Sequence, residues 1–139
     1  MMRSVIAYLT GTTRNEVSEF LDQYYPSEAY RHEHTDAFNW IVYKDGDAVL
    51  WIGFYNDLAS EGGPEEVARI TRALGEEIIV SVSADVSGRH KGQYEATIFI
   101  VGLLSRFHGV AEEDLSDHLW TLQELLNYSR YQGRLFFEY

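Results

Sequence analysis

The hydrophobic and polar positions of residues 1–88 give the same order of elements twice: a strand, a helix and a strand. Residues 3–9 form a short apolar run that is typical of a buried strand. Thr13 and Glu16 have capping-box spacing, which predicts the start of a helix, and Pro26 predicts its end. Between them, apolar side chains recur at the i, i+3, i+4 and i+7 positions of one helix face: Val17, Phe20, Leu21 and Tyr24.

The second half of the repeat begins with a predicted β-hairpin. Residues 38–43 and 49–55 are rich in aromatic and β-branched side chains, and Asp45 with Gly46 supplies the positive φ of a tight turn. A second amphipathic helix is predicted to begin near Pro64 and to end at Gly75 in a left-handed cap. Residues 78–86 alternate between apolar and polar, which predicts the closing strand.

A βαββαβ order predicts a ferredoxin-like α+β fold, in which both helices cover one face of a four-stranded antiparallel sheet. We expect one domain over residues 1–139, with residues 1–88 as the core and residues 89–139 as a helical C-terminal extension that covers the other face.

The extension contains three predicted elements. Residues 94–107 are apolar nearly all round and predict a buried helix ended by Gly109, although residues 97–101 also fit a strand. Thr121 and Glu124 form a second capping-box match ahead of a last helix. Residues 135–139 predict a final edge strand.

Composition restricts the compartment and the chemistry. A chain of 139 residues is long enough for a core of its own, and the absence of cysteine excludes disulfides and thiol catalysis. The N-terminal apolar run is too short for a signal-peptide core, and no segment reaches the length of a membrane span. We therefore expect a cytoplasmic protein.

The net charge of −11 argues against nucleic acid and anionic membranes as partners, because lysine and arginine normally supply that attraction. The acidic residues form two clusters in the sequence, one comprising Glu112, Glu113, Asp114 and Asp117, and the other comprising Asp57, Glu61, Glu65 and Glu66. Such runs usually form a solvated face. The more specific hypothesis is a binding surface for a basic protein, whose association the charge would accelerate.

Three segments are candidates for chemistry, and each has a simpler interpretation. His32, His34 and Asp36 share one side of an extended segment and could hold a metal, yet a polar loop explains them equally well. Residues 87–92 combine glycines, cations and a helix start, as an anion site does, but lack the Gly-Lys-Ser/Thr ending of a phosphate loop.

The third candidate is acid–base catalysis by Asp85 with a histidine, namely His90, His108 or His118. Any carboxylate near a histidine would satisfy this description. We therefore expect binding rather than catalysis, with no catalytic residue, no cofactor and no metal.

Aromatic residues make up 14% of the chain, including ten tyrosines. Such residues stack on nucleic-acid bases or sugars in some proteins, but nucleic-acid platforms also need a positive groove. Tyrosine and tryptophan are enriched in protein interfaces as well, which agrees better with the charge.

Residues 80–88, 103–111 and 119–121 together resemble small acidic bacterial immunity proteins, which protect a cell from a polymorphic toxin of its own or a sibling strain. The resemblance covers the C-terminal half and contains no catalytic motif. It implies a cytoplasmic, non-enzymatic protein that blocks a toxin domain one to one, and it assigns no particular functional residue. The alternative is a dimeric ferredoxin-like enzyme or sensor of small molecules, with its pocket between the sheet and the C-terminal helices.

Overall fold

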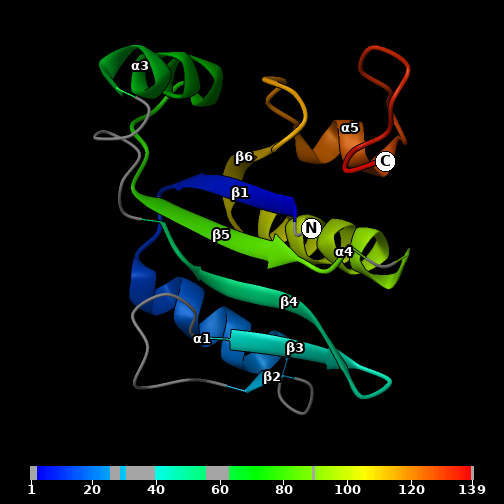
Figure 1. The fold of residues 1–139 in the computed structure, drawn as a ribbon. Helices are drawn as coiled ribbons and strands as arrows, with labels where there is room; N and C mark the ends of the chain where they lie inside the picture. Colours follow the sequence, from blue (N-terminus) through cyan, green and yellow to red (C-terminus); the bar gives the residue numbers. More distant parts are fainter. Residues whose placement is uncertain (1–2, 26–28, 31–39, 56–62, 89, 139) are drawn as a thin grey trace.

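The computed structural model describes residues 3–25, 29–30, 40–55, 63–88 and 90–138, which form a mixed α+β fold (Figure 1). Its elements in chain order are β1 (Arg3–Thr10), α1 (Arg14–Tyr24), β2 (Ala29–Tyr30), β3 (Trp40–Lys44), β4 (Asp47–Phe54), α3 (Gly63–Leu74), β5 (Val80–Val86), α4 (His90–Arg106), β6 (His108–Glu113) and α5 (Leu122–Leu126).

Local signals in the sequence correctly predict where several elements begin and end. Thr13 caps α1, its hydroxyl accepting a hydrogen bond from the Glu16 amide at 3.2 Å. Asp45 and Gly46 turn the hairpin with φ values of 53° and 83°, which both central positions of a type I′ turn require. The capping box that begins α5 is complete, because Thr121 and Glu124 each bond the other's backbone amide.

The sheet is antiparallel throughout, with the strand order β2-β3-β4-β5-β1-β6. A ferredoxin-like sheet would place β1 between β4 and β5. Here β4 pairs directly with β5, Leu50 opposite Val86, and β1 lies on the far side of β5 with Val5 opposite Ala84. The predicted mixed fold and antiparallel sheet are thus confirmed, and the ferredoxin-like strand order is not.

Helices lie on both faces of this sheet, so the prediction that α1 and α3 share a face is wrong. Val17 and Leu21 of α1 belong to the same buried cluster as Val5 of β1, whereas Ile70 of α3 belongs to the cluster of Tyr8. Residues three apart on a strand point to opposite faces. The right-handed crossover rule applies to parallel strands, and α3 joins antiparallel neighbours, so the rule does not fix its side.

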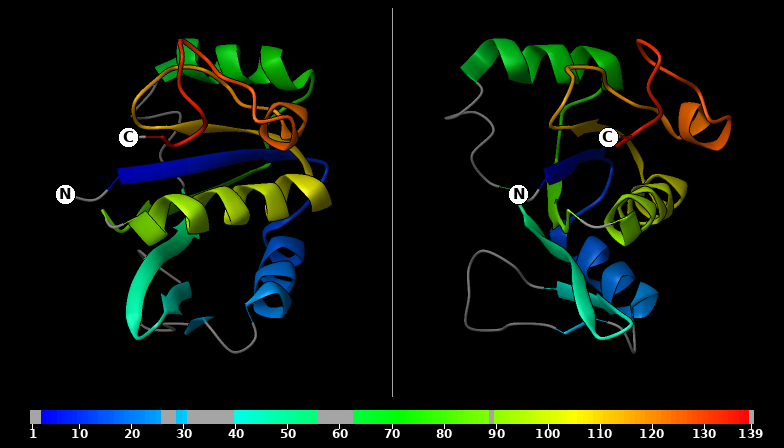
Figure 2. Two further views of the ribbon diagram at one scale, coloured as in Figure 1. Left: turned by 90° about the vertical axis from the view of Figure 1, so that its right-hand side faces the viewer. Right: turned by 45° about the vertical axis from the view of Figure 1, so that its right-hand side comes forward.

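The C-terminal extension contributes a strand as well as helices. Its long helix α4 is confirmed, and it lies on the α1 side of the sheet (Figure 2). The helix ends at Arg106, and Gly109 is not its stop. Gly109 belongs to β6, where an added Cβ would come within 2.5 Å of the Tyr8 carbonyl oxygen, so this glycine permits close strand pairing with β1. The predicted strand over residues 135–139 is wrong for residues 135–138, which turn instead.

The larger of the two apolar clusters lies between the sheet and the pair α1 and α4. It receives Phe99 and Leu103 from α4 and Phe107 from the position after the helix. These side chains are 1%, 0% and 6% exposed, so their predicted burial is confirmed. The smaller cluster lies under α3 and includes Tyr8 and Val110. Burial on both faces explains why β1, inside the sheet, has apolar residues at nearly every position.

Replacing Phe99 by alanine should lower the free energy of unfolding by about 3 to 5 kcal/mol, since the substitution removes a large buried side chain and leaves a cavity. Chemical denaturation measures the change. Tyr94→Ala on the same helix is the matched control, because that side chain is 68% exposed and its loss should change stability by less than about 0.5 kcal/mol. Equal midpoints for the two variants would contradict this packing.

Candidate functional site

The structure separates the predicted acidic surface. Glu112 and Glu113 are consecutive on β6, so their side chains point to opposite faces of the sheet. The Glu113 side chain is 1% exposed, whereas Asp114 and Asp117 are exposed. The expectation that these four carboxylates share one accessible surface is therefore wrong. Asp57 and Glu61 of the second cluster lie outside the described residues.

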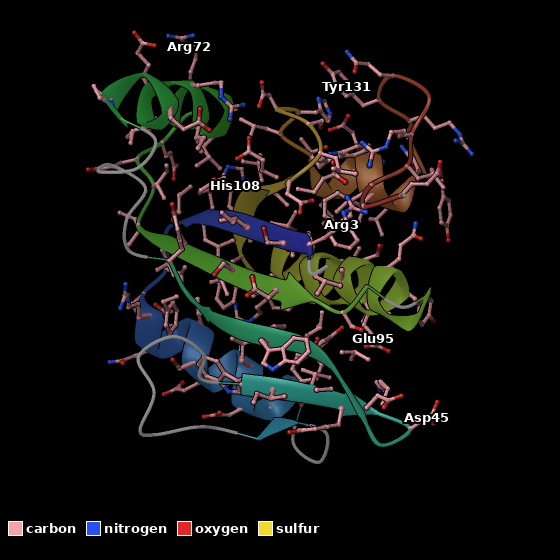
Figure 3. All side chains as sticks on the ribbon, viewed as in Figure 1. Arg3, Asp45, Arg72, Glu95, His108 and Tyr131 are labelled. Atoms are coloured by element: carbon pink, nitrogen blue, oxygen red, sulfur yellow. The ribbon has the colours of Figure 1, made fainter. Side chains whose placement is uncertain are left out.

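The buried Glu113 lies at the centre of an ion-pair cluster, which we call the Glu113 cluster: Arg3, Glu113, Asp114, Arg134 and Phe137. Glu113 accepts from Arg3 at 2.9 Å and from Arg134 at 3.3 Å. Arg3 also donates to Asp114 at 3.1 Å and to the Phe137 carbonyl oxygen at 3.1 Å, with its guanidinium 3.9 Å from the Phe137 ring centre. Figure 3 shows Arg3 between β1 and the C-terminal segment. The cluster therefore joins the first strand, the end of β6 and the C-terminal segment.

Glu112 makes the corresponding connection on the other face of the sheet. It accepts from the Tyr8 hydroxyl at 3.0 Å and from Arg69 of α3 at 2.5 Å. Arg69 also bonds Glu66 and donates to the Asp117 carbonyl oxygen at 2.7 Å. Burial raises the pKa of Glu112, although the hydrogen bonds from Arg69 and Tyr8 oppose that effect. Burial together with the Glu112 charge raises the pKa of Tyr8. These contacts hold α3 against β6.

Sequence reasoning missed these pairs because the cations come from distant parts of the chain. No lysine or arginine lies between Phe107 and Tyr128, which made the segment look like one uncompensated acidic run. In the fold, Arg3, Arg69 and Arg134 reach it from β1, α3 and the C-terminal segment. No local pattern in the sequence predicts ion pairs between residues so far apart.

A groove of about 490 Å³ lies along α4, between the end of α1 and the segment that contains α5. Tyr24 comes from α1, Tyr94 from α4, and Leu126 and Tyr128 from the α5 segment. These four are among the eight large hydrophobic side chains that are exposed in the described part of the chain. Half of the exposed large hydrophobic side chains in the described residues thus lie at this groove.

The groove does not lie where the alternative hypothesis placed a pocket. The α4 residues that line it include Tyr94, Ile98 and Val101, whereas the sheet-facing side of α4 carries buried residues such as Phe99 and Leu103. The groove therefore lies on a flank of α4 that the sheet does not cover. The apolar residues all round α4 predict complete burial, and the i, i+4, i+7 spacing of the three lining residues does not reveal that their stripe stays open.

Few charges line the groove. Among the described lining residues Glu124 is the one carboxylate, and none is lysine or arginine. Glu124 accepts from Thr121 and lies 2.8 Å from the His118 ring nitrogen Nε2. The Tyr24 hydroxyl donates to the Ile98 carbonyl oxygen at 3.3 Å, and burial with the nearby Glu95 charge raises the pKa of Tyr24. The groove offers apolar contact with hydroxyl groups at its rim.

The structure does not assemble an acid–base pair from Asp85 with His108 or His118. Asp85 pairs with Ser4 and His108 with Thr10, which places them near opposite ends of β1, roughly 20 Å apart along the strand. His118 stacks on the Tyr131 ring and contacts Glu124. The His90 side chain lies outside what the structure describes.

The two remaining candidates receive no structural support as binding sites. His32, His34 and Asp36 lie outside the described residues. Among the residues that the structure does describe, no cluster of three or more metal-ligating side chains occurs. In the turn of residues 87–92, a Cβ at Gly92 would come within 2.2 Å of the Ser87 carbonyl oxygen. Close packing of the turn therefore accounts for this glycine.

Comparison with known proteins gives no relative: no family, curated protein or solved structure matches this chain. None of the helices described here has the length and hydrophobicity needed to cross a membrane.

Replacing Glu113 by glutamine should destabilise the fold by about 3 kcal/mol or more, because the buried Arg3 and the partly exposed Arg134 lose their shared counter-charge. Urea unfolding measures the loss. Asp117→Asn removes a carboxylate from the same segment, but an exposed one, and should change stability by less than about 0.5 kcal/mol. If the two substitutions cost the same, the Glu113 cluster does not hold the C-terminal segment.

Burial raises the pKa of Asp85, so its ionised form is disfavoured in the folded state. Asp85→Asn should therefore stabilise the protein at neutral pH. The folded wild type retains the Asp85 proton to higher pH than the unfolded chain, so the advantage of the variant should shrink as pH falls and vanish below the ordinary aspartate pKa of about 3.9. Unfolding free energies measured across this pH range test the sign, and a pH-independent difference would contradict it.

Proposed function

We propose that this chain is a binding protein that neutralises a basic protein partner one to one, as a bacterial immunity protein neutralises its toxin. The observation that carries the proposal is the concentration of exposed Tyr24, Tyr94, Leu126 and Tyr128 at one groove. Exposed apolar side chains that gather in one place mark interaction sites, and tyrosine is enriched in protein interfaces.

Charge identifies the kind of partner. The chain carries −11, while three of its arginines, Arg3, Arg69 and Arg134, are engaged by carboxylates within the fold. The remaining acidic surface includes Glu65 and Asp117, both exposed. Such a surface attracts a cationic protein over about a Debye length and raises its association rate. Apolar contact in the groove would then determine how long the complex lasts.

A small-molecule ligand is the alternative, and the size of the groove is the observation that favours it. About 490 Å³ lies within the usual range of ligand pockets. A small ligand, however, gives no role to the net charge of −11 or to Tyr128, which is 79% exposed at the rim. The protein partner accounts for both.

The partner to test first is the product of the adjacent reading frame. Tyr94→Ala combined with Leu126→Ala should weaken the complex at least about tenfold, mainly through faster dissociation, because the pair removes two exposed apolar contacts at the groove. Surface plasmon resonance gives both rates, and co-expression reports rescue of growth.

Tyr43→Ala with Ile79→Ala is the matched control, since these side chains are also exposed, 43% and 54%, but lie outside the groove. It should leave affinity within about twofold. Equal weakening by the two double variants would exclude the groove as the contact surface.

Reversing Glu65 and Asp117 to lysine should slow association with the same partner and leave dissociation almost unchanged, because charges outside the groove act mainly on encounter. Raising the salt concentration should slow the wild type in the same way. Stopped-flow measurements at two ionic strengths test both points. An association rate that changes neither with salt nor with the reversal would show that charge does not accelerate binding of this partner.

A further inference from the structure

The helix α4 has two apolar stripes, of which one is left open. Its inner stripe, which includes Phe99, Ile100 and Leu103, is buried against the sheet. Its second stripe, Tyr94, Ile98 and Val101, is only partly covered and forms the floor of the groove. A helix that is apolar all round is normally buried all round. The second stripe therefore has the character of a surface that another element covers.

The shape of the groove follows from these elements. The open stripe extends over eight residues of α4, from Tyr94 to Val101, or roughly 10 Å, which is about two helical turns. Leu126 and Phe136 come from the C-terminal side of the groove, and Tyr24 comes from α1. The groove is thus a short trough that follows α4, and it is called the trough below.

The chemistry of the trough favours an occupant that satisfies its own backbone. The main-chain groups of α4 are bonded within the helix, and the Thr97 hydroxyl already donates to the Gln93 carbonyl oxygen at 3.1 Å. An extended peptide would find no strand edge to pair with and would leave its own amides unbonded. A helix brings no such cost, and its i, i+3, i+4 and i+7 side chains match the spacing of the open stripe.

We propose that this trough binds a two-turn amphipathic helix of the partner, with the apolar face of that helix on Tyr94, Ile98 and Val101 and its lysines or arginines directed outward. The inference rests on the proposed function and specifies its contact. The cationic character follows from the chain's charge of −11 and from the absence of lysine and arginine among the described lining residues. A second copy of this chain would bring another −11 to the same place and be repelled.

The test uses a helix-stapled peptide of about 14 residues, rich in lysine and alanine, with leucine at i, i+4 and i+7. Methyl NMR spectra of the full chain should show saturable shifts at Ile98, Val101 and Leu126. Three control peptides complete the set: one with the same composition and its leucines on different faces, one with glutamate for lysine, and one with a central proline. Each should bind at least about tenfold more weakly.

Leu126→Gln should weaken binding of the first peptide at least about tenfold, whereas Ile79→Gln should leave it within about twofold. The two side chains are matched, with exposures of 53% and 54%, and only Leu126 lies at the trough. Both substitutions are on exposed positions, so both variants should fold, and thermal melts check that they do.

Several outcomes would overturn the inference: equal binding of the peptide with scattered leucines, equal binding of the proline peptide, or an unaffected Leu126→Gln variant. A dimer in sedimentation experiments that Leu126→Gln dissolves would place a second copy in the trough instead. If the helical peptide fails while the natural partner still depends on Tyr94 and Leu126, the helical occupant is wrong and the proposed function stands. If the peptide binds as expected and the adjacent gene product does not bind, the proposed function fails alone.

Discussion

The pairing of the buried Glu113 with Arg3 and Arg134 is the interaction on which the arrangement of the C-terminal third depends. Glu113 is the last residue of β6, Arg3 begins β1, and Arg134 belongs to the segment that follows α5. A buried carboxylate needs compensating charge, and here two cations share it. Arg3 also donates to the Phe137 carbonyl oxygen, so the same contacts hold the C-terminal segment in place. Phe136, the residue before Phe137, lines the groove. The surface offered to a partner is therefore positioned by an ion-pair cluster inside the fold.

Features fixed by neighbouring residues could be predicted from the sequence, and features fixed by distant pairing could not. Thr13, Gly46 and Thr121 act through the backbone within a few residues, so their caps and turn followed from local chemistry. The strand order depends on which of two antiparallel pairings β4 makes, and both satisfy the same hydrophobic pattern. Gly109 illustrates the limit: a glycine after a helix usually ends it, whereas this one permits close contact with β1.

The candidate site shows the same division. Burial of Phe99 and Leu103 could be predicted from α4's spacing, but the open stripe could not, because periodicity does not reveal which apolar face remains uncovered. The acidic run was visible in the sequence, while its compensation by arginines more than twenty positions away was not. Consecutive carboxylates on a strand point to opposite faces. Glu112 and Glu113 of β6 therefore make separate contacts, Glu112 with Arg69 on one face and Glu113 with Arg3 on the other.

These internal ion pairs also indicate where the excess negative charge of the chain lies. Arg3 and Arg134 compensate Glu113 and Asp114, and Arg69 compensates Glu66 and Glu112, so those groups form nearly balanced sets within the fold. The excess of 22 acidic over 11 basic residues therefore resides mainly in the other carboxylates. A surface of this kind repels copies of itself and attracts cationic proteins. Charge at long range and an apolar trough at contact are complementary requirements for one partner: the first selects its sign, and the second selects its shape.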